Sequence, residues 1–382
     1  MKRYLSFTLI FLIASPFFTI LSVPAYVVVI SLLMLNLIKP RTGHSNIINK
    51  KSWFALIYVA TASLLSIYQN TQANLPYALI FLSIYISFAL MSSKDTLWLL
   101  NVGSRLLFIV LTMAWIGLLY SSLGFNPIYS FINPNGDIND LYLTTLSNAG
   151  ADYIRPGGIY NEPGYLGLYV SAIVFARRMM KLDDRFSAIL LLMALVTQSI
   201  VLIAFALLWF ANIIFNINLR KINFTFGWTF PLILIFSILT VSSGLLGWAY
   251  DRMLLLLLDQ LFNPRLVSLN LILDEISGSF THTIFGFDVA CIERSDMCSN
   301  LGGNPLVPLI FGGLLYSWPY YAAIIYLVYS SIFGSDTLLK IGAIIVVASQ
   351  PVMLELPYSA LYLFVIICWI KSRNLNSKYL TK

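Results

Sequence analysis

The chain has 382 residues, of which 59% are hydrophobic and 10% are charged, whereas globular proteins contain roughly 25% charged residues. This small number of charged residues cannot cover the surface of a soluble protein. The composition therefore excludes a soluble enzyme, a disordered chain and a secreted disulfide-rich scaffold, and it predicts an integral membrane protein. The net charge of +7 is explained by Lys and Arg residues that collect in the cytoplasmic loops of membrane proteins, so no nucleic-acid partner is expected.

Apolar stretches long enough to cross a bilayer, about 17–25 residues each, predict about twelve transmembrane helices in one integral membrane domain, 1–382. The first stretch follows Lys2 and Arg3. We interpret it as a span rather than a signal peptide, because no small-residue cleavage site leads into a polar mature start. The predicted spans are 4–22, 24–38, 53–69, 76–91, 97–120, 164–176, 186–198, 200–217, 224–248, 305–333, 338–354 and 357–370.

A break is predicted within the apolar run from Phe186 to Phe215, which is too long for one span. The polar residues Thr197, Gln198 and Ser199 lie at the middle of this run. We therefore expect two helices joined by a tight turn at these three residues.

The charged residues divide unevenly between the two sides of the predicted membrane when the N-terminus is placed inside. Of the 23 basic residues, 18 fall in cytoplasmic segments, and 12 of the 16 acidic residues fall outside or at the outer face. By the positive-inside rule, both termini are predicted to be cytoplasmic. The basic residues left outside are all arginines, whose guanidinium groups bind phosphate through two parallel hydrogen bonds. They are Arg155, Arg252, Arg265 and Arg294.

Two outer loops are long enough to hold a functional site. The first, 121–163, is rich in turn-forming residues, and the second and larger loop is 250–304. The leucine run 254–258 in the second loop has the pattern of a helix lying on the membrane surface. Cys291 and Cys298 also lie there, where an oxidising compartment permits a disulfide, and we predict one. No metal site and no cofactor are predicted.

The end of the first loop carries the most informative pattern, the stretch 155–167, RPGGIYNEPGYLG. Pro163 suits a first helical turn, and Glu162 just before it faces the positive end of the helix dipole. Glycines at 157, 158, 164 and 167 allow tight bends and close approach of another segment. The pattern therefore predicts that Arg155 and Glu162 are held on a rigid turn at the membrane surface.

This stretch resembles the Arg, Gly and Glu-Pro signature of bacterial O-antigen polymerases of the Wzy type, in the O-antigen polymerase and ligase superfamily. Further along, LVTQSIVLIAF (195–205), the segment from Asp251 to Asp288, and NPLVPLIFGGLLYSWPYY (304–321) are similar to the following elements in the same order. The resemblance covers 155 to 333. It implies an all-α polytopic fold like that of GT-C-type membrane glycosyltransferases.

The resemblance implies glycosyl transfer at the periplasmic face of the bacterial inner membrane. Donor and acceptor are then undecaprenyl-pyrophosphate-linked oligosaccharides, and a chain-length regulator and a flippase are implied partners. Glu162 and Arg155 are the expected catalytic residues, with Glu162 either deprotonating the acceptor hydroxyl or only orienting Arg155. The expected contacts to pyrophosphate or sugar are Arg252, Arg265, Tyr160, Asn161, His282 and Asn304.

Two alternative functions remain open from the sequence. The related O-antigen ligases carry a His before the Asn that opens the closing span, whereas Gly303 stands before Asn304 here, which argues against a ligase. A flippase or other transporter needs ionisable groups at the membrane midplane. Only Arg105 and Glu355 approach the predicted spans, and both lie near span ends.

Overall fold

A computed structural model of the chain describes residues 93–132, 138–148, 154–160, 162–216, 278–285, 306–332 and 336–349, with single helical residues at 361, 365, 368 and 369. The predicted spans before residue 93, the span 224–248 and most of the second loop lie outside these residues. The leucine run 254–258 and the predicted Cys291–Cys298 disulfide also lie outside them.

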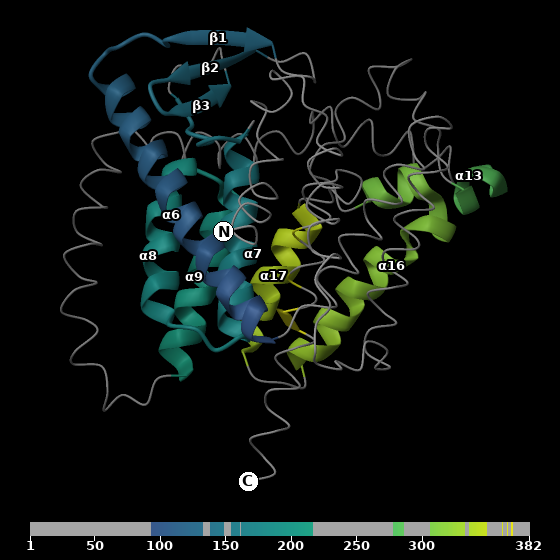
Figure 1. The fold of residues 1–382 in the computed structure, drawn as a ribbon. Helices are drawn as coiled ribbons and strands as arrows, with labels where there is room; N and C mark the ends of the chain where they lie inside the picture. Colours follow the sequence, from purple (N-terminus) through teal and green to yellow (C-terminus); the bar gives the residue numbers. More distant parts are fainter. Residues whose placement is uncertain are drawn as a thin grey trace, which may run out of the picture.

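Four helices form the central group (Figure 1). They are α6 (Ser93–Ser122), α7 (Pro163–Met179), α8 (Asp184–Ala194) and α9 (Ile200–Asn216). Each contains a long apolar run, and their bounds agree with the predicted stretches 97–120, 164–176, 186–198 and 200–217 to within a few residues. Their facing sides form a shared core that includes Leu107, Leu111, Ile173, Leu190 and Phe205, all fully buried.

The predicted break between two helices at residues 197–199 is confirmed. Helix α8 ends at Ala194 and is followed by a single 3-10 turn, η1 (Leu195–Thr197). Gln198 then adopts a left-handed backbone conformation, with φ 52° and ψ 30°, and α9 begins at Ile200. Since an L-residue with a Cβ pays about 1–2 kcal/mol for this conformation, the reversal at Gln198 is held by its surroundings.

A three-stranded antiparallel sheet follows α6 in the first outer loop, where the sequence predicts only turns in an all-helical protein. Strands β1 (Tyr129–Ile132), β2 (Ile138–Tyr142) and β3 (Thr145–Asn148) are hydrogen-bonded in the order β1-β2-β3. Figure 1 shows the sheet at one end of the helix group, with β1 outermost. The expectation of an all-α fold is therefore wrong in this loop. The strands are so short that their alternation of apolar and polar residues is not distinguishable from the turn-forming sequence around them.

Strand β3 packs against the last third of α6 at Gly117. A Cβ atom at this position would lie 2.7 Å from the carbonyl oxygen of Tyr142 and would also overlap Thr145. The neighbouring Thr144 hydroxyl donates a 2.6 Å hydrogen bond to the carbonyl of Met113 in α6. Glycine at 117 thus lets the sheet lie directly on the helix.

We predict that Gly117→Val separates β3 from α6 and lowers the free energy of unfolding by about 1–3 kcal/mol, the usual cost of overpacking. Thermal unfolding of the detergent-solubilised protein measures the change. Gly278→Ala is the matched control, since nothing lies within 4 Å of a Cβ there. Equal thermal midpoints for the Gly117→Val variant and the unmodified protein would contradict the packing described.

Two further helices, α16 (Val307–Ile332) and α17 (Thr337–Ser349), correspond to the predicted spans 305–333 and 338–354. The short helix α13 (Phe280–Phe285) precedes them. Helix α17 packs on α9, where Gly342 brings the two backbones close at Phe205. Helix α16 is interrupted at Gly313, with φ 55° and ψ −170°. Glycine alone tolerates this backbone conformation.

One of the described helices, over Thr96–Ser122 in α6, is long and apolar enough to cross a membrane. Two shorter apolar helices cover Ile200–Phe215 and Thr337–Ala348.

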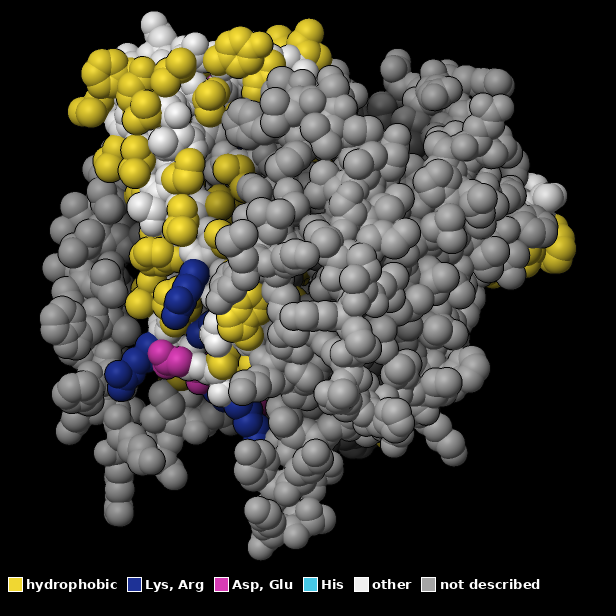
Figure 2. Space-filling model, in the orientation of Figure 1, with side chains coloured by type: hydrophobic (Ala, Val, Ile, Leu, Met, Phe, Trp, Pro, Cys, Tyr) yellow, Lys and Arg dark blue, Asp and Glu magenta, His cyan; other side chains and the backbone are white. Residues whose placement is uncertain are grey.

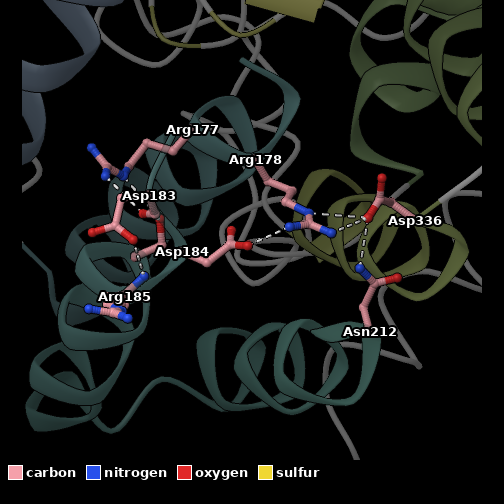
Figure 3. Close-up of polar contacts among 8 residues, drawn as sticks. Arg177, Arg178, Asp183, Asp184, Arg185, Asn212 and Asp336 are labelled. Atoms are coloured by element: carbon pink, nitrogen blue, oxygen red, sulfur yellow. Dashed lines mark hydrogen bonds and ion pairs between the residues drawn. The ribbon is translucent and has the colours of Figure 1, made fainter. Parts of the chain in front are cut away.

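Charged residues join the helices at the end of the group that is opposite the sheet in Figure 1, and Figure 3 shows their contacts. Oδ1 of Asp336 accepts hydrogen bonds from Arg178 Nε (3.2 Å), Arg178 Nη2 (3.0 Å) and Asn212 Nδ2 (2.9 Å). Arg178 also pairs with Asp184. These contacts tie α7, α8 and α9 to the start of α17. Arg178, Asp184 and Asp336 all belong to segments predicted to be cytoplasmic, so residues assigned to one side by charge counting meet at one end of the fold.

Arg177 lies beside this cluster and is itself buried, and its hydrogen bonds go to neutral groups. Its guanidinium donates to the Ser187 hydroxyl at 2.9 Å, the Ser104 hydroxyl at 3.1 Å and the Asp183 carbonyl at 3.1 Å. It also lies 5.0 Å above the ring of Phe186. These bonds join α6, α7 and α8, so Arg177 is a structural cross-link between the three helices at this end.

We expect Asp336→Ala to lower the free energy of unfolding by about 1–3 kcal/mol, because the half-buried Arg178 loses one of its two carboxylates. The side chains of Arg178 and Asp336 are 25% and 20% exposed, so solvent screens little of this loss. Thermal unfolding measures the effect, and Lys181→Ala, at an exposed position between α7 and α8, is the control. An Asp336→Ala protein as stable as the control would contradict this role.

Candidate functional site

The candidate site lies where the predicted loop end meets the starts of α7 and α9. Residues 154–160 run beneath the sheet and lead into α7 at Pro163 (Figure 1). Strand β3 holds this segment: the amide of Leu146 donates to the carbonyl of Gly158 at 2.8 Å, and the amide of Gly157 donates to the carbonyl of Leu146 at 2.7 Å. The segment carrying Arg155 is thus a short extension of the sheet.

Two hydroxyls of β3 hold two more amides of the same segment. The Ser147 hydroxyl accepts from the Arg155 amide at 3.1 Å, and the Thr145 hydroxyl accepts from the Gly158 amide at 2.9 Å. Both hydroxyl residues are fully buried. Their spacing of two along the strand puts them on one face, so the backbone at Arg155 is fixed by a rigid strand.

The predicted tight glycine contacts are confirmed at three positions. A Cβ at Gly157 would lie 2.7 Å from the carbonyl oxygen of Tyr160, and one at Gly158, where φ is +65°, would lie 2.6 Å from Cγ1 of Val110 in α6. A Cβ at Gly167 in α7 would lie 3.2 Å from Cβ and Oγ of Ser199. The glycines therefore draw the loop, α6, α7 and the α8–α9 turn together around one point.

Arg155 is half-buried at this point. Its Nη2 donates to the main-chain carbonyl of Gln198 at 3.4 Å, across 43 positions of sequence. The left-handed conformation of Gln198 turns this carbonyl out of the helical direction and makes it available as an acceptor. A cation is thus positioned by the sheet on one side and by the interrupted α8–α9 pair on the other.

Glu162 occupies the N-cap position of α7, as the sequence predicts, with Pro163 in the first turn. Its carbonyl accepts from the amides of Tyr165 and Leu166, which begins the helix. Its half-buried carboxylate makes no capping hydrogen bond, so capping α7 does not account for an acidic residue here. The positive end of the helix dipole favours the ionised form at this position.

Gln198 is a residue of the site that the predicted set of catalytic and binding residues omits. Its side chain is 3% exposed. Its Oε1 is buried and accepts no hydrogen bond within the described part of the chain. A buried acceptor without a donor costs about 1–3 kcal/mol. Two features of the sequence point to Gln198. It is one of three polar residues inside an apolar run, and it lies in the segment 195–205 that carries part of the resemblance.

Tyr160, which the sequence predicts as a sugar contact, is buried in this structure and packs on α7. It is 1% exposed and stacks on Tyr169 of α7, with ring centroids 4.8 Å apart. Burial raises the pKa of its phenol well above the usual range, so the hydroxyl stays protonated. The large aromatic ring fills the space behind the turn that carries Arg155 and Glu162. The sequence pattern alone does not distinguish a ring that packs in this way from one that faces a ligand.

The structure does not describe the side chains of the other predicted contacts. Arg252, Arg265, Asn161 and Asn304 lie outside them, and His282 is described only as part of the backbone of α13. Of the predicted catalytic pair, both members are described, and they flank the same glycine turn.

The position of Arg155 can be tested through the backbone of Gln198. We predict that Gln198→Gly retains function, because it keeps the carbonyl and relieves the left-handed strain. Gln198→Val disfavours the left-handed conformation by about 1–2 kcal/mol. We expect it to displace the carbonyl that positions Arg155 and so to impair function. The activity of the variants in cells and the thermal midpoint of the purified variants are the measurements. A functional Val variant or an inactive Gly variant would reject a role for the turned carbonyl.

Comparisons of the chain with models of known protein families, with curated proteins and with solved structures find no match.

Proposed function

We propose that the protein is a membrane glycosyltransferase of the O-antigen polymerase (Wzy) type. It joins oligosaccharide repeat units by transferring a glycan from undecaprenyl pyrophosphate to another undecaprenyl-linked unit at the outer face of the bacterial inner membrane. The resemblance of 155–333 and the apolar composition support this reading. The observation that carries it is a half-buried arginine bonded to Ser147 and Gln198, in the loop that leads to an N-cap carboxylate without a capping bond.

The proposed reaction breaks the bond between the anomeric carbon and a pyrophosphate oxygen, which leaves with the electron pair. Arg155 is a suitable stabiliser of the negative charge on this leaving group, since a preorganised cation costs no reorganisation when the charge develops. Its Nη2 donates a hydrogen bond to the Gln198 carbonyl, which orients the guanidinium. Arg252 and Arg265 are the further cations proposed to bind the pyrophosphate.

The new bond forms between the anomeric carbon and a hydroxyl oxygen of the acceptor sugar. Glu162 is the proposed base that receives the hydroxyl proton, a role typically worth about 10²–10⁴-fold in rate. Its backbone has the extended N-cap conformation, φ −132° and ψ 146°, and its carboxylate makes no capping bond. His282, Asn161 and Asn304 are proposed sugar contacts, and a chain-length regulator and a flippase remain proposed partners.

One feature favours a transporter instead, the interruption of α16 at Gly313, because transporters build substrate sites at broken helices. The sequence of α16, VPLIFGGLLYSWPYYAAIIYLVYSSI, contains no Asp, Glu, Lys, Arg or His. A substrate or ion site at the midplane needs such groups. The polymerase reading therefore explains more of the chain than the transporter reading.

A deletion strain distinguishes the three functions. Loss of a polymerase leaves single repeat units attached to the lipid A core and removes the longer ones. Loss of a ligase removes all attached units, and loss of a flippase traps lipid-linked units on the inner leaflet. We expect the first pattern, and either of the other two would reject the proposed function.

A further inference from the structure

We propose that the β1–β2 hairpin and the segment before it lie in the headgroup layer of the outer leaflet and contact phospholipid there. We call this surface the hairpin surface, and its residues are Leu123, Phe125, Ile128, Tyr129, Ile132 and Ile138. The inference rests on the membrane placement contained in the proposed function, and it adds a lipid-binding role for a part of the chain that the reaction does not use.

The hairpin surface is apolar and open. Leu123 is 75% exposed, Ile132 is 71% exposed, and the remaining members are 52–58% exposed. No charged residue occurs in β1, and the rings of Tyr129 and Phe131 stack at 6.1 Å. Figure 2 shows these hydrophobic side chains gathered at the sheet end of the molecule. In water, such a surface costs free energy in proportion to its apolar area.

The hairpin surface continues an apolar stripe along α6. Ile109, Ile116 and Leu119 are exposed on one side of this helix, and their spacing and that of Leu123 follow the helical repeat. The opposite side, with Leu107, Leu111 and Ala114, is buried in the core. The stripe is therefore the side of α6 that faces lipid in the proposed membrane, and it leads toward the hairpin.

The inner end of the α6 span lies at Thr96, two residues after Lys94, where the apolar part of the helix begins. A hydrocarbon core of about 30 Å corresponds to about 20 residues of helix at 1.5 Å each. Counting from Thr96, an upright α6 reaches the outer edge of the core near residue 116. Leu123 and the hairpin follow beyond this edge, at the level of the headgroups.

The depth of the sheet follows from its contact with α6. Gly117 packs on β3 and lies 21 residues beyond Thr96, so β3 lies at the outer edge of the hydrocarbon core. Strand β1 is outermost in the sheet and lies at the outer boundary (Figure 1). An open strand edge is excluded from hydrocarbon but is satisfied by water and headgroups. Tyrosine and phenylalanine beside this edge suit the same layer, where aromatic residues concentrate.

A photocrosslinking experiment tests this contact without altering the native cysteines. Ile132 is replaced by p-benzoyl-phenylalanine in the full-length protein, which is reconstituted in nanodiscs of phosphatidylcholine and phosphatidylglycerol, irradiated and analysed by mass spectrometry. Leu119 in the stripe of α6 is the lipid-facing reference, and Lys378 in the predicted cytoplasmic tail is the aqueous reference. We expect lipid adducts at Ile132 close to the yield at Leu119 and about tenfold above that at Lys378, because acyl chains are confined to the bilayer.

The outcomes separate this inference from the proposed function. Lipid adducts at Leu119 with none at Ile132 would overturn the hairpin contact and leave the membrane placement intact. Absence of adducts at both positions would reject the membrane placement itself. The same variants irradiated in native membranes add a second check, since adducts of Ile132 mainly with another protein or with a second copy of the chain would also overturn the lipid contact.

Discussion

Replacement of Arg155 by Ala is expected to abolish long-chain glycan at the cell surface and to slow transfer by about 10²–10³-fold, the loss typical when a preorganised donor to a developing anion is removed. The backbone of Arg155 is held by the Ser147 hydroxyl, so the strand and the loop keep their connection when the side chain is shortened. The loss therefore falls mainly on the charge and not on the fold.

Arg185→Ala is the matched control for Arg155→Ala. Arg185 is an exposed arginine near the start of α8, at the end of the helix group opposite the sheet, and it is the backbone amide of Arg185 that bonds to Asp183. We expect this control to keep full chain length at equal membrane abundance. Arg155→Lys keeps the charge but loses the planar fork, so an intermediate chain length is expected. Full chain length in Arg155→Ala would contradict the role assigned to this residue.

Glu162→Gln is expected to lower the rate of the transfer step by about 10²–10⁴-fold when the carboxylate acts as the base. The substitution is structurally mild, because the carboxylate makes no capping bond and the backbone of Glu162 begins α7 in either case. Single-turnover transfer with lipid-linked repeat units measures the chemical step, and the dependence on acceptor concentration separates it from binding.

A purely orienting role of Glu162 predicts a different result. The glutamine amide still accepts hydrogen bonds, so the transfer step then slows by less than about tenfold, and the loss appears mainly as weaker substrate binding. Asp140→Asn is the control for removal of an outer carboxylate, since Asp140 accepts a 2.6 Å bond from Ser130 within the sheet. Glu162→Gln with an unchanged transfer rate and an unchanged dependence on acceptor concentration would contradict both roles.

The elements that sequence reasoning predicts well are those that depend on local pattern. The helix α6, the Pro163 start of α7 and the break at residues 197–199 each follow from an apolar run, a proline or a polar interruption, which are properties of a few neighbouring residues. The clustering of Arg178, Asp184 and Asp336 follows less directly, since charge counting assigns them to one side but not to one another.

The features that the sequence leaves hidden depend on contacts between distant segments. Strands of four and five residues become stable only by pairing with each other and by packing on Gly117. Tyr160 is buried because Tyr169 stacks on it. The loop carrying Arg155 lies beside the middle of α6 because Gly158 fits against Val110. The sequence predicts this loop at the membrane surface, whereas Val110 lies 12 residues before the end of α6, about 18 Å along the helix.

Such a depth is consistent with the satisfied backbone of the loop. Irregular chain within a membrane must be covered by protein or line a water-filled cavity. Four hydrogen bonds between residues 145–147 and 155–158 meet this requirement. If the protein spans the bilayer as proposed, Arg155 is then partly withdrawn from bulk water, where its interaction with an anion is strengthened.

The most direct test of the central claim is polymerisation by the purified protein in lipid vesicles. Undecaprenyl-pyrophosphate-linked repeat units, extracted from a deletion strain of the host bacterium, serve as donor and acceptor, and products are resolved by length. The account predicts a ladder of lengthened lipid-linked glycans with the unmodified protein and single units with Arg155→Ala. Unextended units with the unmodified protein, or an undiminished ladder with Arg155→Ala, would contradict it.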